Sequence, residues 1–289
     1  MFKKNKKFFY LLIVFFILAF ICSIFYFFGI RLDKNASFFA FNFYSFIPLL
    51  AVFIIKVSYG EKFWQKDFYN FKFNANFLLV IYFLLGLELL IFTFDILLPI
   101  TYFSNDQGVL LEKYGSIFSS QQFAVMTKFT KDFDINFFWI LNVFIGIIVG
   151  VTTGTIFAYF QEIGWRGFLY NELKDKSFWA ASIEIGLWHS LFYLFLVLIG
   201  YGDFYLVIVW LLLSPILMLI RKLSDSIIYP AIFVGVFNST YALATFYVVG
   251  APQWLIAVNG LGGIFILLLT NICLYLYMLY RERHAMSLI

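Results

Sequence analysis

Long apolar runs separated by short polar stretches dominate this sequence. A membrane-spanning helix needs roughly 20 mostly apolar residues, and eight runs approach or exceed that length. These runs cover residues 8–30, 37–57, 77–100, 137–160, 178–199, 204–220, 226–250 and 254–280. The pattern predicts an all-α fold, a polytopic integral membrane bundle of about eight transmembrane helices.

One long polar stretch divides the chain into three parts. We expect residues 1–136 to hold the N-terminal membrane helices and an outer loop at 101–136, residues 137–250 to form a core, and residues 251–289 to supply the last transmembrane helix and a cytoplasmic tail. The loop has room for one short amphipathic helix but not for a separate domain. The first run is too long for a removable signal peptide and lacks its small-residue cleavage site, which favours a signal anchor.

Composition points to the same environment. The chain is 63% hydrophobic and only 12% charged, whereas soluble domains average about 25% charged residues. So few charges exclude a cytosolic enzyme, a nucleic-acid binder and a disordered chain, and membrane lipid is the expected partner. Abundant Phe, Ile, Lys and Asn are typical of an AT-rich genome, which favours a bacterial multi-pass protein of the plasma membrane. Cys22 and Cys273 lie in apolar runs without metal-site or disulfide spacing.

The distribution of basic residues predicts the orientation. With the N-terminus in the cytoplasm, fifteen of the 20 Lys and Arg residues fall in cytoplasmic segments. Three of the other five lie in the long segment 101–136, where the positive-inside rule is weak. The short outer turns near 200–203 and 250–253 carry none. We therefore expect a cytoplasmic N-terminus.

Several ionisable or polar side chains fall inside the predicted spans. Ionisable groups are costly in a membrane and by default suggest function. The acids and the imidazole are Glu88, Asp95, Glu184 and His189, and Asn238 adds a carboxamide midway along the seventh run. A lone membrane histidine can instead hydrogen-bond to a neighbouring carbonyl, and a lone asparagine often joins two helices.

The segment from Gln161 to Tyr170, which reads Gln-Glu-Ile-Gly-Trp-Arg-Gly-Phe-Leu-Tyr, stands at the inner end of the fourth run. Glu162 and Arg166 are four residues apart, so they share a helix face and can form an ion pair. Glu184 precedes His189 by five residues, which turns the two side chains about 140° apart on a helix, and we do not pair them.

Three segments together resemble the CPBP family, the CAAX-protease and bacteriocin-processing (Abi) intramembrane proteases. The family pattern is Glu-Glu-x-x-x-Arg, then Phe-x-x-x-His, then His-x-x-x-Asn on successive membrane helices. Here these patterns correspond to residues 161–166, 185–189 and 234–238, and the resemblance covers about residues 137–250. Gln161 replaces the first Glu, Ile185 the Phe, and Val234 the His of the third pattern.

The resemblance implies that the first Glu and the second-pattern His activate water, and that the third-pattern His and Asn stabilise the oxyanion. Carried over by position, the catalytic candidates are Gln161, Glu162, Arg166, His189 and Asn238. Glutamine cannot accept a proton at neutral pH, and valine offers neither a donor nor a ligand. No cofactor is expected. A catalytic zinc needs about three protein ligands, which this set supplies poorly, although a divalent metal stays open.

Three functions follow as alternatives. The first is a CPBP-type membrane endopeptidase that cuts a hydrophobic or lipidated peptide from the cytoplasmic side. The second is a catalytically silent member that binds another membrane protein, as a regulator or in bacteriocin immunity. The third is a transporter that uses Glu88, Asp95 and Glu184. For the first two, we expect the candidate side chains to meet at a cavity open to the cytoplasm, with Glu162 and Arg166 at its rim and Glu184 facing elsewhere.

Overall fold

The computed structural model describes residues 5–27, 44–63, 68, 75–104, 135–199, 203–241, 247–252 and 254–286. The amphipathic helix expected within 101–136 falls on residues 105–134, which lie outside the described residues. Apolar helices account for most of the described chain. They are α1 (Lys6–Phe27), α3 (Phe46–Ser58), α5 (Ala75–Leu97), the consecutive helical segments from Ile135 to Glu172, α11 (Phe178–Leu198), α12 (Phe204–Ser224), α13 (Ile228–Thr240) and α14 (Leu261–Met286).

Within the described residues, six helices are long and apolar enough to cross a membrane. The protein is therefore an all-α, multi-pass membrane protein. Eight spans were predicted, and the two that fall short are those expected at 37–57 and 226–250. Their helices, α3 and α13, have 13 residues each, or about 20 Å at 1.5 Å per residue, against a hydrocarbon core of roughly 30 Å.

The helical stretch from Ile135 to Glu172 changes its winding along its length. It comprises α8 (Ile135–Val149), the π-helix η2 (Gly150–Gly154), α9 (Thr155–Glu162), the π-helix η3 (Ile163–Leu169) and α10 (Tyr170–Glu172). A Cβ on Gly235 of α13 would lie 2.5 Å from the carbonyl oxygen of Gly150. The glycines therefore let the two backbones touch, as small residues do at membrane helix interfaces, and this contact fixes α13 beside η2 and α9.

Helices α11 and α12 form an antiparallel pair at the centre of the bundle. The Ser177 hydroxyl caps α11 by accepting from the Ala180 amide. Farther along, a Cβ on Gly186 would lie 2.8 Å from Cβ of Ser214 in α12. The Ser214 hydroxyl donates to the Ser182 carbonyl at 2.8 Å. Such close approach and interhelical hydrogen bonding join membrane helices where the hydrophobic effect does not.

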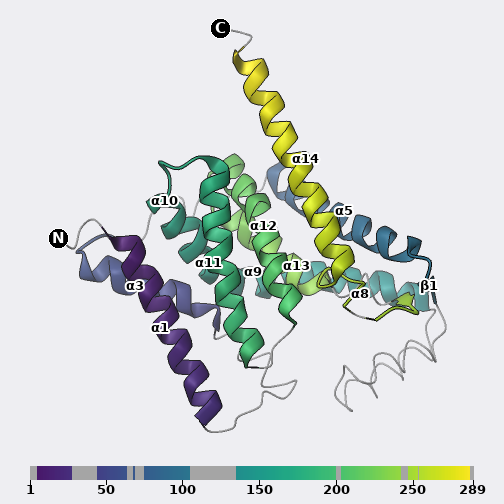
Figure 1. Cartoon of the computed structure of the whole chain (residues 1–289), viewed down its shortest axis with the longest axis horizontal. Helices are drawn as coiled ribbons and strands as arrows, with labels where there is room; N and C mark the ends of the chain where they lie inside the picture. Colours follow the sequence, from purple (N-terminus) through teal and green to yellow (C-terminus); the bar gives the residue numbers. More distant parts are fainter. Residues whose placement is uncertain are drawn as a thin grey trace.

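Two short strands close the end of the bundle near α5. Strand β1 (Tyr102–Phe103) pairs antiparallel with β2 (Val248–Val249), the only strands among the described residues. Gly250 follows β2 with φ of +96°, and a Cβ there would lie 2.6 Å from the Ile100 carbonyl oxygen, so only glycine suits this turn. In Figure 1, β1 lies at the far end of α5, and α14 projects beyond the other helices.

Lysine–carboxylate pairs gather at one end of α1. Glu61, which follows α3, accepts from Lys6 and from Lys56, the latter at 2.8 Å. Glu184 of α11 pairs with Lys7 and with a lysine of the loop before α11. We call this the lysine-rich end of the bundle. These pairs tie the start of α1 to α3 and to α11.

Candidate functional site

The π-helix η3 places the most conspicuous sequence segment inside the protein. All seven of its residues, Ile163 to Leu169, are buried. Gly164 permits this, because a Cβ at that position would lie 2.5 Å from Cβ of Pro48 in α3. π-Helical turns are rare and often occur at functional sites. Here the wider turn directs both Trp165 and Arg166 toward the centre of the bundle, and neither is exposed.

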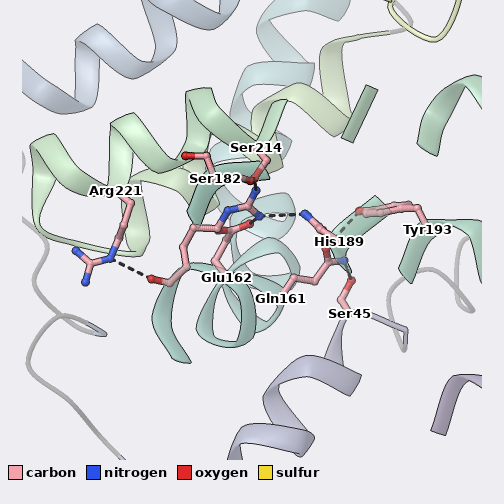
Figure 2. Close-up of polar contacts among 9 residues, drawn as sticks. Ser45, Gln161, Glu162, Ser182, His189, Tyr193, Ser214 and Arg221 are labelled. Atoms are coloured by element: carbon pink, nitrogen blue, oxygen red, sulfur yellow. Dashed lines mark hydrogen bonds and ion pairs between the residues drawn. The ribbon is translucent and has the colours of Figure 1, made fainter. Parts of the chain in front are cut away.

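Arg166 is the centre of a buried polar network (Figure 2). Its Nη1 donates to Oε1 of Glu162 at 2.9 Å and lies 3.0 Å from Nδ1 of His189. Its Nη2 donates to the Ser214 hydroxyl at 3.4 Å. Arg221 of α12 donates from Nε to the Arg166 carbonyl at 3.2 Å. Glu162 and Arg166 have fully buried side chains, so the expected pair forms in the interior and not at the rim of a cavity.

The contacts of His189 define its tautomer. A guanidinium donates hydrogen bonds and accepts none, so the Nδ1 that faces Arg166 carries the lone pair. The hydrogen is therefore on Nε2, which lies 3.4 Å from Oε1 of Gln161. Each ring nitrogen is engaged. The only lone pair of His189 that could accept a proton faces a cation.

Gln161 links the network to the start of α3 and adds a second contact with α11. Its Nε2 donates to the hydroxyl of Ser45 beside α3 at 2.7 Å, and its Oε1 accepts from the Tyr193 hydroxyl at 3.2 Å. Gln161 is 1% exposed, and Ser45 is fully buried. The residue in the position of the family's first Glu is thus a carboxamide whose donor and acceptor are both occupied by protein groups (Figure 2).

Aromatic rings enclose His189. The ring of Trp165 stacks on it with centroids 5.1 Å apart, and the rings of Trp210 and Tyr193 lie at 4.8 Å and 5.2 Å. His189 has no exposed surface. The imidazole is therefore closed off from the protein surface by side chains.

Asn238 occupies a different place. It is half-buried on α13 and lines a cavity with Gln161 and Tyr193, but Glu162, Arg166 and His189 are not among the cavity-lining residues. The structure therefore brings Gln161, Glu162, Arg166 and His189 into one network and places Asn238 across a cavity from Gln161. The other lining residues lie mainly in the halves of the helices remote from the lysine-rich end. That the candidate side chains meet at a cavity open to the cytoplasm stays a prediction.

Two further positions at which the chain differs from the CPBP patterns, besides Gln161, are both in the core. Ile185 has no exposed surface, and Val234 is 1% exposed. Both pack in the main hydrophobic cluster. Neither adds a polar group to the site.

The three remaining acids do not form a path. Glu88 forms a hydrogen bond with the Thr240 hydroxyl at 2.7 Å, and Asp95 accepts from the Ala257 amide at 2.8 Å. Glu184 belongs to the lysine-rich end, away from His189. Each acid has its own local partner, so the arrangement does not favour the transporter alternative. Within the described residues, no three His, Cys, Asp or Glu side chains come together as metal ligands.

Sequence reasoning missed the serine and tyrosine members of the network: Ser45, Tyr193 and Ser214. Tyr193 follows His189 by four residues on α11 and therefore shares its face, a signal that was available in the sequence. Ser45 and Ser214 gave no such signal, because a serine within an apolar run commonly bonds only to its own helix.

Comparison with known proteins gives no relative: no family model, no curated protein and no solved structure matches this chain. The resemblance to the CPBP family therefore rests on the sequence motifs alone.

Proposed function

We propose that this chain is a CPBP-type membrane protein that does not hydrolyse peptides and acts by binding a hydrophobic or membrane-embedded polypeptide. The observation that carries this proposal is the contact of His189 Nδ1 with Arg166 Nη1 at 3.0 Å. It occupies the lone pair that a general base would use. The family membership rests on the motifs, and the loss of activity rests on this contact.

Peptide hydrolysis requires a base that activates water and donors that stabilise the oxyanion. A general base contributes about 10²–10⁴-fold, and one oxyanion donor about 10²–10³-fold. Gln161 replaces the base, and Val234 replaces one donor. The retained Asn238 lines the cavity without His189 beside it, so the catalytic set is both incomplete and separated.

Glu162 is a poor substitute for the missing base. One of its oxygens accepts from Arg166, the carboxylate has no exposed surface, and the residue does not line the cavity. A base must reach the proton it abstracts directly or through one water. Glu162 therefore serves to neutralise Arg166, and the pair supports the π-helix.

We further propose that the N-terminus is cytoplasmic and that the protein belongs to a bacterial plasma membrane. The positive-inside distribution supports this orientation. The structure adds that the pairs of Lys6, Lys7 and Lys56 with carboxylates lie at one end of the bundle. Labelling of single cysteines from either side of intact cells tests this orientation.

A cleavage assay tests the proposal that the protein does not hydrolyse peptides. The full chain is reconstituted in vesicles with a fluorescent reporter peptide, beside the variant His189→Ala and the double variant Gln161→Glu with Val234→His. We expect no cleavage that depends on His189 in the parent. Cleavage by the parent that His189→Ala abolishes would overturn the proposal. Activity gained only by the double variant supports a scaffold that has lost its catalytic groups.

A further inference from the structure

Glu88 lies near the middle of α5, on the face that packs against the rest of the bundle. The residue is only 7% exposed. Leu84 and Ile91, which share its helix face at i−4 and i+3, have no exposed surface. The carboxyl is therefore set among apolar side chains, where a negative charge without a partner is strongly disfavoured.

The Thr240 hydroxyl, at the end of α13, contacts two oxygens at once. Its Oγ1 lies 2.7 Å from Oε1 of Glu88 and 2.7 Å from the carbonyl oxygen of Val236, one turn earlier in α13. Both distances are those of well-formed hydrogen bonds between oxygens. A hydroxyl has one hydrogen and two lone pairs, so it can donate along only one of these two contacts.

The second contact needs a hydrogen from the other partner. A backbone carbonyl oxygen only accepts, so Thr240 donates to Val236 and the hydrogen between Thr240 and Glu88 belongs to Glu88. If Thr240 donated to Glu88 instead, its Oγ1 and the Val236 oxygen would stand 2.7 Å apart with no hydrogen between them. A protonated carboxyl has one O–H donor, and the Thr240 oxygen has lone pairs to accept it. Both contacts are satisfied only when Glu88 is a neutral acid.

Among the described residues, no charged group compensates a negative charge on Glu88. The elements packed most extensively against α5 are α13, α14 and β2. Phe265 of α14 packs on Phe94 of α5, so residues 281–284, which are charged or titratable and follow near the end of α14, stand beyond the level of Glu88. The other titratable side chains on α5 and these elements, none of which bonds to Glu88, are Asp95, Tyr229, Tyr241, Cys273, Tyr275, Tyr277 and Tyr280.

We propose that Glu88 is a proton-binding site, whose carboxyl holds a hydrogen at neutral pH and donates it to Oγ1 of Thr240. The ligand of this site is a single proton. It completes the hydrogen-bond chain from Glu88 through Thr240 to Val236, which joins α5 to the turn of α13 that also carries Asn238. Without the proton, three oxygens would share one hydrogen, so this contact between α5 and α13 depends on it.

Infrared difference spectroscopy tests the proposal directly, because the C=O stretch of a carboxylic acid and the stretches of a carboxylate absorb at different frequencies. Spectra of the full chain in lipid nanodiscs at pH 7, where an exposed glutamate is ionised, are compared with those of Glu88→Gln. We expect the variant to lose one acid band and no carboxylate band. The matched control is Glu61→Gln, which should lose a carboxylate band, because Glu61 pairs with Lys6 and Lys56.

A second variant tests where the hydrogen goes. Thr240→Val removes the oxygen that accepts from Glu88 and leaves the carboxyl itself intact. We expect the acid band to persist and to move to higher frequency, since the carboxyl has lost its hydrogen bond. Glu88→Gln is expected to fold, because a carboxamide N–H can donate to Thr240 as the acid O–H does.

Loss of a carboxylate band in Glu88→Gln would overturn the proposal, and so would an acid absorption equal to that of the parent. An acid band that Thr240→Val leaves unmoved would show that Glu88 does not donate to Thr240. If Glu88→Gln did not fold, the position of the acid band in the parent and in Thr240→Val would decide alone. None of these outcomes depends on whether the protein cleaves peptides.

Discussion

The network around Arg166 and the cavity beside Asn238 share Gln161 and Tyr193, yet they use their carboxamides differently. In the network, Gln161 is buried and uses both its donor and its acceptor on protein groups. On the cavity wall, Asn238 is only half-buried and is not part of the network. Two carboxamides that line one cavity can thus differ in whether they stabilise the fold, and residue type alone does not tell which of them does.

The largest expected effect comes from removing the centre of the network. Arg166→Met leaves Glu162 buried without its partner, and breaking a buried ion pair costs about 3–5 kcal/mol. We expect a loss of that size in the free energy of unfolding, measured by titration with a denaturing detergent in mixed micelles.

The double variant Arg166→Met with Glu162→Gln provides the matched control. It removes both charges, so it should recover most of the loss. If Arg166→Met alone were as stable as the parent, the ion pair of Glu162 with Arg166 would not be stabilising the fold.

Two carboxamides that line the same cavity give a sharper comparison. Gln161→Leu removes the carboxamide that contacts Ser45, Tyr193 and His189, and each buried group left unsatisfied costs about 1–3 kcal/mol. Asn238→Leu removes a carboxamide that is not part of the network, and we expect a change within about 0.5 kcal/mol. Unfolding titrations of the two variants provide the measurement. Similar losses in both would refute the distinction between network and cavity.

The smallest expected effect lies outside both regions, at the lysine-rich end. Hydrogen bonds from Lys56 and Lys6 hold the pKa of Glu61 below its usual value. A carboxylate with a depressed pKa adds stability above the pKa of the unfolded chain, and this stability is lost as pH falls through the lower folded-state value. Surface pairs contribute about 0–1 kcal/mol. We expect Glu61→Gln to lower stability slightly at pH 7 and to reduce its loss on acidification.

Unfolding midpoints at several pH values between 7 and 3 measure this difference. Lys62→Gln is the control, since Lys62 is exposed beside the same carboxylate and is not in these pairs. Parallel pH profiles for the parent and Glu61→Gln would show that the ion pairs of Glu61 do not contribute to the pH dependence of stability.

Hydrophobic patterning predicted where the helices lie, because burial in lipid depends on runs of apolar residues that are visible in the chain. It did not predict the ends of α3 and α13. The glycine turn at Gly250 and the pairing of Tyr102–Phe103 with Val248–Val249 depend on contacts between distant segments. A window of hydropathy cannot detect such contacts.

The candidate site likewise combines a local contact, which the sequence predicts, with a contact between distant segments, which it does not. The pairing of Glu162 with Arg166 is local to one helix, and the sequence predicted it. The contact of Arg166 with His189 spans 23 residues and requires the π-helical turn of η3, which has no distinct sequence signature. For that reason the sequence suggested a histidine at a wet pocket, whereas the structure encloses it among aromatic rings.

The short length of α3 has a consequence for the lipid around the protein. Leu50, Phe53 and Val57 on this helix are exposed, while charged Glu61 follows it within a few residues. A hydrophobic segment shorter than the surrounding hydrocarbon draws headgroups inward or compresses the acyl chains. The bilayer is therefore expected to be locally thinned along this flank. An extended peptide segment that crosses the membrane beside α3 would pass through less hydrocarbon there than elsewhere.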